Sequence, residues 1–427
     1  MIRTYSFPCP LPKPEADALN RASGRIYTRA MVEHYRVYRQ TGHWLSPAGL
    51  EKLVDFYEAQ DGQARLLHAH SIDAAEQGFP KACKTAKACK QAGWPNAHYP
   101  HKRKFWRTTI WKKSGFRVQE GVLLLARARG LEPIRVKLPS QLASLPPKNF
   151  TEMRLVWDPA SRRYHWHLVV EAGQPNAEPP GAGVLAGDQG EIHPITLTDG
   201  DTATVLSARA LRSVRQYTNK RLAEIQAAQS RRQKGSRQWK KLQRRKNRFL
   251  AQQRRRATDI EHKVSRAVVD EAVERQAGTL ALGDVRDVAD GKQLNAKSQQ
   301  KVSTWGHGQL RQYITYKAEA AGIAVELVDE HHTSQTCPNC GARHKPRGRL
   351  YRCPACGFAA HRDVVGAANI LSRRQFGEVG RIVPPPCGKT KYRHPFCDRK
   401  TGKRSRPDTA EMVCGLVVLE TQEAAPL

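Results

Sequence analysis

The chain has 427 residues and is strongly basic, with 72 Lys and Arg against 39 Asp and Glu. This length allows two to four domains, each with its own core. The formal net charge of +33 predicts a polyanionic partner, with nucleic acid favoured over an anionic membrane surface. No run of 18 apolar residues is present, and the N-terminus lacks the apolar core of a signal peptide. We therefore expect a cytoplasmic protein whose ten cysteines lie in a reducing compartment.

The N-terminal part of the chain combines strands with a helical insertion. Residues 2–8 alternate as a strand does, and four nearby prolines end this pattern. Apolar residues at helical spacing then predict helices in 15–94. Strands follow in 95–175, and the last two read as a hairpin. A Pro- and Gly-rich stretch at 176–183 predicts a linker and a domain boundary.

Residues 101–111 interleave cations with aromatic residues, and two interpretations of this pattern stay open. The first is a nucleic-acid-binding surface, with cations on phosphates and rings against bases or sugars. The second is an ordinary strand with aromatic residues in the core and solvated charges. Under the first interpretation the candidate contacts are Lys102, Arg103, Lys104 and Trp106.

Residues 210–276 read as two basic helices that join near Gly235. The stretch 211–263 carries 18 Lys or Arg against 3 Asp or Glu, so neighbours one helical turn apart repel each other. A polyphosphate partner relieves this repulsion and releases counterions. The candidate nucleic-acid contacts are Arg231, Arg232, Lys234, Arg237, Lys240, Lys241, Arg244, Arg245, Lys246, Arg248, Arg254 and Arg255.

Two Cys-x-x-Cys motifs, each with a Pro inside and a Gly after it, predict a zinc ribbon. The expected Zn²⁺ ligands are Cys337, Cys340, Cys353 and Cys356. Four thiolates leave no open position for water, so the site should be structural. The alternatives are disulfides or unrelated buried thiols. Two further cysteines, Cys387 and Cys397, flank a histidine, which leaves a second metal site open.

The order of motifs around the ribbon resembles the C-terminal end of TnpB nucleases and of the compact type V CRISPR effectors. The ribbon runs directly into Arg362-Asp363 and a run of small, helix-forming residues, with Val365 where the family usually has Asn. Upstream, an apolar strand ends in Asp188, and Gly190 follows, as in the first RuvC motif. Alone, Asp-x-Gly is a weak signal that also occurs in simple turns.

The resemblance implies an α/β multidomain protein with an RNase H-like RuvC domain. That domain would comprise 184–330 and 360–372, interrupted by the ribbon at 331–359. Residues 1–14 and 95–175 would form a wedge-like β-barrel, and 15–94 its helical recognition lobe. Residues 373–427 are expected to form a basic, mobile tail.

The second RuvC motif departs from the family, because Gly283 stands where the family has a catalytic Glu. RuvC sites hold two Mg²⁺ ions with three carboxylates. Asp188 and Asp363 remain as catalytic residues and Mg²⁺ ligands, whereas glycine supplies no ligand. Asp287 and Glu330 are the acidic residues that could replace the missing one. In this respect the chain is similar to the cleavage-deficient type V-M (V-U) effectors.

The resemblance therefore implies an RNA-guided protein that binds double-stranded DNA without cutting it. Its cofactors would be Zn²⁺, Mg²⁺ and a guide RNA, either a CRISPR RNA or a transposon-derived RNA. Such binding would silence transcription or block invading DNA in antiviral defence, on the nucleoid of a prokaryotic cell. One alternative is an active RNA-guided, Mg²⁺-dependent endonuclease with a substituted third ligand. The other is an unguided zinc-ribbon DNA-binding protein.

Overall fold

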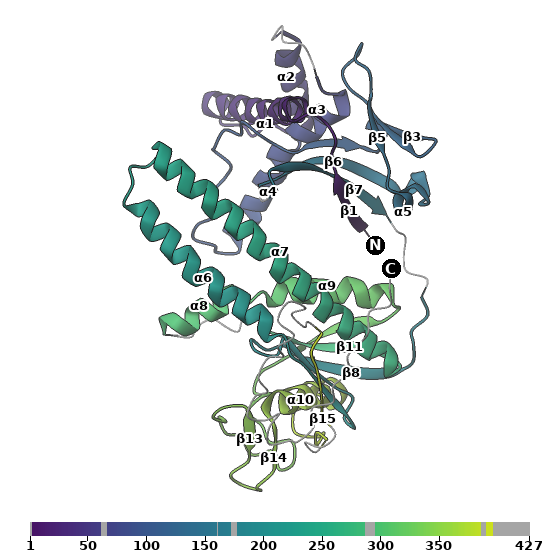
Figure 1. Cartoon of the computed structure of the whole chain (residues 1–427), viewed down its shortest axis with the longest axis vertical. Helices are drawn as coiled ribbons and strands as arrows, with labels where there is room; N and C mark the ends of the chain where they lie inside the picture. Colours follow the sequence, from purple (N-terminus) through teal and green to yellow (C-terminus); the bar gives the residue numbers. More distant parts are fainter. Residues whose placement is uncertain are drawn as a thin grey trace. The chain divides into compact units, whose positions relative to one another are not determined.

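The computed structural model describes residues 2–60, 66–159, 161–171, 177–286, 295–385 and 390–395. The chain divides into two compact units, 1–174 and 175–427, which are considered separately below (Figure 1). The boundary between the units precedes the stretch 176–183 that was predicted as a linker. Among the described residues, no helix is both long and apolar enough to cross a bilayer.

The first unit contains the predicted helical insertion as four helices. They are α1 (Lys13–Thr41), α2 (Pro47–Gln60), α3 (Ala69–Glu76) and α4 (Gly78–Gln91). Helix α1 begins after Pro12, because a proline near a helix start needs no amide hydrogen bond. It ends at Gly42, whose φ of 71° is a conformation that glycine adopts without strain.

The strands of the first unit form two antiparallel sheets around one core. The four-stranded sheet has the order β1 (Ile2–Pro8), β7 (Arg163–Glu171), β6 (Phe150–Asp158) and β2 (Thr109–Lys112). The three-stranded sheet contains β3 (Phe116–Gln119), β4 (Val122–Leu125) and β5 (Ile134–Lys137), and the short helix α5 (Ser140–Ala143) follows β5. The predicted hairpin is β6 with β7, and the N-terminal strand β1 pairs with β7.

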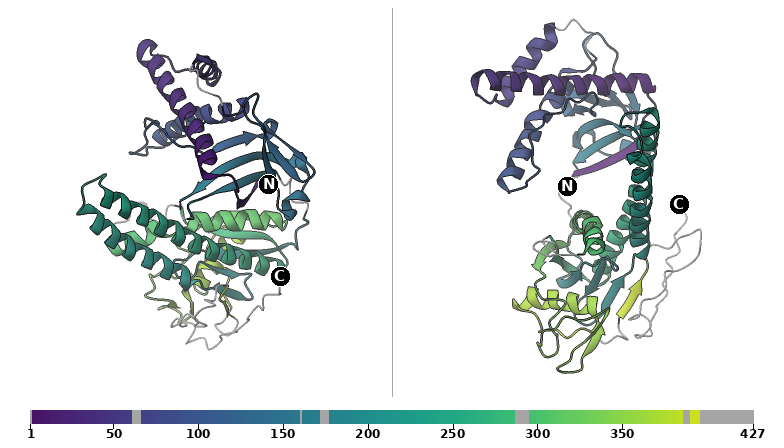
Figure 2. Two further views of the ribbon diagram at one scale, coloured as in Figure 1. Left: turned by 45° about the horizontal axis from the view of Figure 1, so that its top comes forward. Right: turned by 90° about the vertical axis from the view of Figure 1, so that its left-hand side faces the viewer.

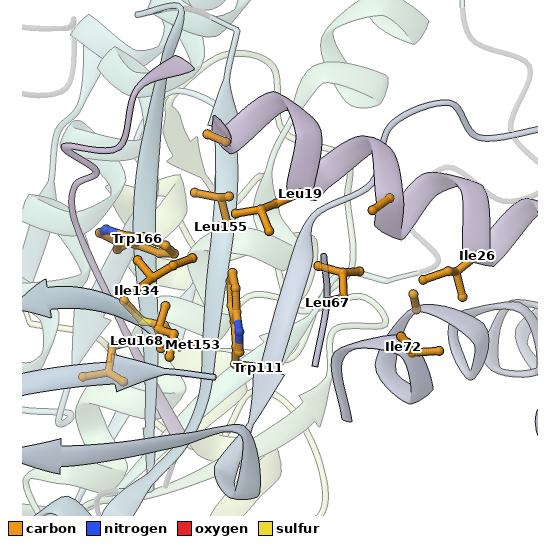
Figure 3. Packing of buried hydrophobic residues seen from close by; sticks show 14 of the residues in the cluster. Leu19, Ile26, Leu67, Ile72, Trp111, Ile134, Met153, Leu155, Trp166 and Leu168 are labelled. Carbon is orange, nitrogen blue, oxygen red and sulfur yellow. The ribbon is translucent and has the colours of Figure 1, made fainter. Parts of the chain in front are cut away.

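The core of this unit joins both sheets to the helices (Figure 3). Trp111 and Trp166 lie at its centre with their rings in edge contact, 5.9 Å apart. Leu19 of α1 and Leu155 of β6 pack beside them. Helix and strands are therefore stabilised by the same apolar contacts, which dominate the free energy of folding.

The second unit is built on a six-stranded mixed sheet. Its order is β12 (Ala324–Asp329), β11 (Ala277–Asp284), β8 (Gly183–Asp188), β9 (Ile195–Thr198), β10 (Ala203–Leu206) and β15 (Thr390–Arg393). Strands β8, β11 and β12 are parallel, whereas β9 is antiparallel to both of its neighbours. This is the mixed α/β arrangement that the sequence predicted for the RuvC-like domain.

The predicted basic pair is α6 (Arg209–Ser230) and α7 (Arg237–Glu274), which lie side by side (Figures 1 and 2). They join at Gly235, whose φ is 87°, as expected from the sequence. Three contacts bind the two helices along their length: Arg215 to Glu261 at 2.9 Å, the rings of Tyr217 and Phe249, and Gln229 to Gln243 at 2.8 Å.

Helices α8 (Ala296–Thr304), α9 (His307–Ala320) and α10 (Arg362–Phe376) complete the second unit. The ribbon between β12 and α10 contains a small hairpin of β13 (Leu350–Arg352) and β14 (Ala359–His361). The expectation of a mobile tail from residue 373 needs correction. Helix α10 continues to Phe376, and β15 pairs with β10 through the buried Tyr392. Residues 396–427 lie outside the described residues.

Candidate functional site

The carboxyl ends of three neighbouring strands meet on one side of the second sheet. Strand β8 ends at Asp188, β11 at Asp284 and β12 at Asp329, and α10 packs against β8. Parallel strands end at the same edge of a sheet, which is where ligands bind in such folds. A cavity of about 1020 Å³ lies there, and Asp188, Glu330 and Asp363 are among the residues that line it. We call it the carboxylate cavity.

Asp188 approaches the backbone of α10 closely. A Cβ atom at Gly366 would lie 2.4 Å from Asp188 Oδ2, so a larger residue at this position would displace the Asp188 carboxylate. Burial raises the pKa of Asp188, and the charges of Glu330 and Asp363 raise it further. The three carboxylates line the same cavity, where a divalent cation would offset their mutual repulsion. Of the three, Asp363 has further possible metal ligands within 4.8 Å, namely His193 and His361.

Glu330 occupies the space that a side chain at residue 283 would need. A Cβ atom on Gly283 would lie 1.8 Å from Glu330 Oε1 and 2.5 Å from its Cδ. Strands β11 and β12 pair Asp284 with Asp329, and Glu330 is the residue after Asp329. The side chain of Glu330 turns back toward Gly283 of β11. The end of β12 thus places a carboxylate next to residue 283 of β11.

Helix α10 fixes the position of Glu330 from both sides. Arg373 donates to the carbonyl of Asp329 at 2.7 Å and to that of His331 at 2.9 Å. The buried Asn369 donates to the carbonyl of Thr333 at 2.7 Å, and the amide of Thr333 donates back to the carbonyl of Glu330 at 3.1 Å. Glu330 and Asp363 are therefore positioned by the same helix.

The buried environment of the Glu330 carboxylate suits a metal ligand. Its Oε1 is buried and has no hydrogen-bond partner within the described ranges. Burial raises its pKa to about 7, and the nearby charges of Asp284 and Asp329 act in the same direction. A buried, unsatisfied carboxylate is costly, and binding a hard cation is one way to remove that cost.

Asp363 lies in the first turn of α10 and is 7% exposed. Both of its oxygens accept from Nη1 of Arg349 at 2.9 Å, and Arg349 precedes strand β13 of the ribbon. Its amide donates to Nδ1 of His361, which caps the helix. The ring of a second buried histidine, His193, is in edge contact with that of His361, with centroids 5.5 Å apart. Arg349 and His193 were not predicted from the sequence, because the folded ribbon and the loop after β8 bring them to Asp363 from far along the chain. His361, two residues before Asp363, was also missed.

Two other acidic residues, Asp284 and Asp287, are close to Gly283 in the sequence. Asp284 lines the carboxylate cavity but is held by Arg286 at 2.9 Å and by Arg311 at 3.6 Å. These partners lower its pKa. Asp287, the second residue suggested as a replacement ligand, lies outside the described residues. Of the two suggested replacements, the described structure brings Glu330 to the carboxylate cavity.

The four ribbon cysteines converge as the sequence predicted. Their sulfur atoms lie within 4.8 Å of one another, with Cys337 and Cys356 3.7 Å apart and Cys340 and Cys353 3.6 Å apart. Tetrahedral Zn²⁺ with bonds of about 2.3 Å needs sulfur separations of about 3.8 Å, so the cluster fits zinc without rearrangement. Cys387 and Cys397 of the other suggested metal site lie outside the described residues.

Most of the candidate cations of the helical pair lie at the surface. All twelve candidates on the loop and on α7 are exposed except Lys246, which is partly buried. This exposed positive charge suits a polyanion.

The segment at 101–111 divides between the two interpretations. Lys102, Arg103 and Lys104 are exposed, and Phe105 is 79% exposed. Trp106 instead is partly buried and stacks on Tyr164 at 6.2 Å, so its ring packs within the fold. Trp111 is in the core. Of the three aromatic residues here, Phe105 has the exposure that a base-stacking ring would need.

Comparisons with known proteins agree with this architecture. A family model described as "Cas12f1-like, TNB domain" matches residues 307–370, and one described as "Probable transposase" matches 167–289. The TnpB-like protein MJ0751 of Methanocaldococcus jannaschii is 31% identical over 140 residues, which cover 32% of this chain and 49% of that protein. The CRISPR-associated endodeoxyribonuclease Cas12f1 of Sulfoacidibacillus thermotolerans is 34% identical over 112 residues, covering 26% and 25%.

The fold itself extends further than these sequence matches. The chain spans at most about half the length of the two relatives. The cryo-EM structure of a Cas12f1–sgRNA–target DNA complex covers 84% of this chain and 83% of its own chain, at a TM-score of 0.59 and 12% identity. Parts of the chain are thus similar in sequence to TnpB-like proteins and to Cas12f1, and its fold is similar to that of the Cas12f1 chain in this complex.

Proposed function

We propose that the protein is an RNA-guided, magnesium-dependent DNA endonuclease in which Glu330 replaces the missing Glu at residue 283. The observation that carries this proposal is the carboxylate of Glu330 in the space beside Gly283. Binding without cleavage was expected because Gly283 supplies no ligand. Because the carboxylate of Glu330 lies beside residue 283, we favour the active alternative, and binding without cleavage stays a prediction.

The guide and target are proposed from the relatives and from the charge of the chain. The similar Cas12f1 structure is a complex with a single-guide RNA and target DNA. The exposed cations of the α6–α7 pair would bind the phosphates of such a duplex. Base pairing with the guide would then select the target, while the protein reads a short flanking motif. The protein would act on DNA in a prokaryotic cytoplasm, at the nucleoid when bound.

Each group in the carboxylate cavity has a distinct role in this proposal. Asp188, Glu330 and Asp363 would hold Mg²⁺, which when bound activates water and stabilises the leaving oxygen. The oxygen-only donors of these three residues suit a hard cation. Arg349 neutralises Asp363 here and is placed to contact a phosphate once a cation takes over that role. Its planar guanidinium suits phosphate oxygens.

The test is cleavage of a matched plasmid by the protein purified with its own RNA. We expect nicked or linear DNA with Mg²⁺ in the wild type, and no such product from Asp363→Ala or after digestion of the RNA. Both treated samples should keep the fold. Matched binding without cleavage in the wild type would instead support the binding-only hypothesis, and equal binding of any duplex without RNA would support an unguided DNA-binding protein.

The magnesium requirement should depend on pH because a proton competes for Glu330. A pKa of about 7 means that this carboxyl is protonated below neutrality, whereas its ordinary value is 4.5. In metal-free protein the free energy of unfolding should therefore fall as pH rises from 4.5 through 7, since the unfolded chain releases the proton first. We expect Mg²⁺ to raise Tm more at pH 8 than at pH 6. In Glu330→Gln this difference should shrink; an undiminished difference would contradict the assignment.

A further inference from the structure

A second cavity, of about 450 Å³, lies in the same unit as the carboxylate cavity. Helix α6, helix α8 and the loop after β8 form its walls. Most of the side chains that line it are hydrogen-bond donors. They are Arg212, Arg215, Gln216, Asn219, Lys220, Gln300, Lys301 and Thr304, with Glu191 as the carboxylate and Ala223 as the apolar residue.

The two cavities share a wall. Gly190 lines the carboxylate cavity, and the next residue, Glu191, lines the second one. On the other side, Trp305 lines the carboxylate cavity and Thr304 the second. Consecutive Cα atoms are 3.8 Å apart, so the cavities adjoin at two places along the chain.

The charges of the second cavity favour an anion. Arg212 is 3.2 Å from Glu191, and Arg215 is 2.9 Å from Glu261, so both guanidinium groups are held in place. Lys220 from α6 and Lys301 from α8 add two charges from facing walls. Positive charge therefore exceeds negative charge, and amide groups supply further donors.

We propose that this second cavity binds a backbone phosphate of the DNA strand that is being cut, close to the phosphate under attack. The inference rests on the proposed function, because it takes the carboxylate cavity as the place of cleavage. A strand lying across that cavity continues over the shared wall, where the next phosphates meet Lys220 and Lys301. Arginines already fixed by carboxylates lose little freedom on binding, which suits them to phosphate recognition.

Substitution of the two lysines separates strand binding from chemistry. In the RNA-bound protein, Lys220→Ala with Lys301→Ala should raise KM for matched DNA about tenfold, leave kcat within about twofold, and reduce the slope of log Kd against log salt by about 1 to 2. The matched control is Lys220→Arg with Lys301→Arg, which keeps both charges and should keep KM. An unchanged KM in the alanine variant would overturn the proposal, as would equal losses in both variants.

Neutral phosphate analogues show whether one phosphate is responsible. Single methylphosphonate linkages are placed at successive positions around the cut, and binding is measured with Asp363→Ala protein so that no cleavage is needed. A methylphosphonate at one position should weaken DNA binding by the protein that keeps Lys220 and Lys301. The same methylphosphonate should have little further effect on DNA binding by the double alanine variant. If that position weakens both proteins equally, the phosphate lies elsewhere. Because binding is measured directly, failure of this proposal is distinguishable from absence of nuclease activity.

Discussion

Removing the carboxylate at residue 330 should cause a loss of cleavage. Introducing a carboxylate at residue 283 in the same variant should restore cleavage. Glu330→Ala takes away one of three carboxylates and should lower the cleavage rate by at least about 10²-fold, the scale of losing one stabilising group in an active site. In Gly283→Glu with Glu330→Ala, the space left by Glu330 receives the new side chain, whose Cβ would start 1.8 Å from the former Oε1 position. We expect a measurable part of the activity to return.

Two controls separate the effect of the carboxylate at residue 283 from the effect of replacing the glycine there. Gly283→Ala with Glu330→Ala also replaces the glycine at residue 283, but without adding a carboxylate, and should stay inactive. Gly283→Ala alone should lower activity, because its Cβ displaces Glu330 from its position. Target binding, measured by gel shift, should be retained throughout. If Glu330→Ala cleaves at the wild-type rate, Glu330 is no ligand, and another acid such as Asp287 becomes the candidate.

Loss of the ribbon zinc should abolish cleavage although no carboxylate is changed. Cys353→Ser with Cys356→Ser removes two of four thiolates, and structural zinc sites contribute about 10 kcal/mol or more of binding free energy to folding. The ribbon carries Arg349, which binds Asp363, and it begins at the turn of Thr333 that Asn369 holds. Unfolding of the ribbon should therefore release both Asp363 and Glu330 from their positions.

The measurement is zinc content by elemental analysis, together with cleavage of matched DNA. We expect one Zn²⁺ per wild-type chain and nearly none in the double variant. The matched control is Cys89→Ser on α4 of the first unit, which should keep both zinc and activity. Full zinc retention in the double variant would show that the four cysteines are not the ligands. Zinc loss with normal cleavage would show that the ribbon does not position the carboxylates.

Local sequence patterns determined much of this protein. The spacing of Cys337, Cys340, Cys353 and Cys356 specified a cluster because four thiolates at these intervals can reach one tetrahedral ion. Asp188 and Asp363 were predicted through the resemblance of their flanking motifs to RuvC motifs, because Asp-x-Gly alone is a weak signal. The two basic helices and their break at Gly235 were also evident, since helical periodicity and glycine conformations are local properties.

The tertiary structure decided what fills the place of the missing ligand. The position of Glu330 depends on the register of β11 with β12 and on contacts from Arg373 and Asn369, which no local pattern records. The same limit applies to Trp106. The sequence around it fits a nucleic-acid surface, but its ring packs on Tyr164 in the folded molecule. Side chains far apart in sequence meet only when strands pair and helices pack, so their roles follow from the folded molecule.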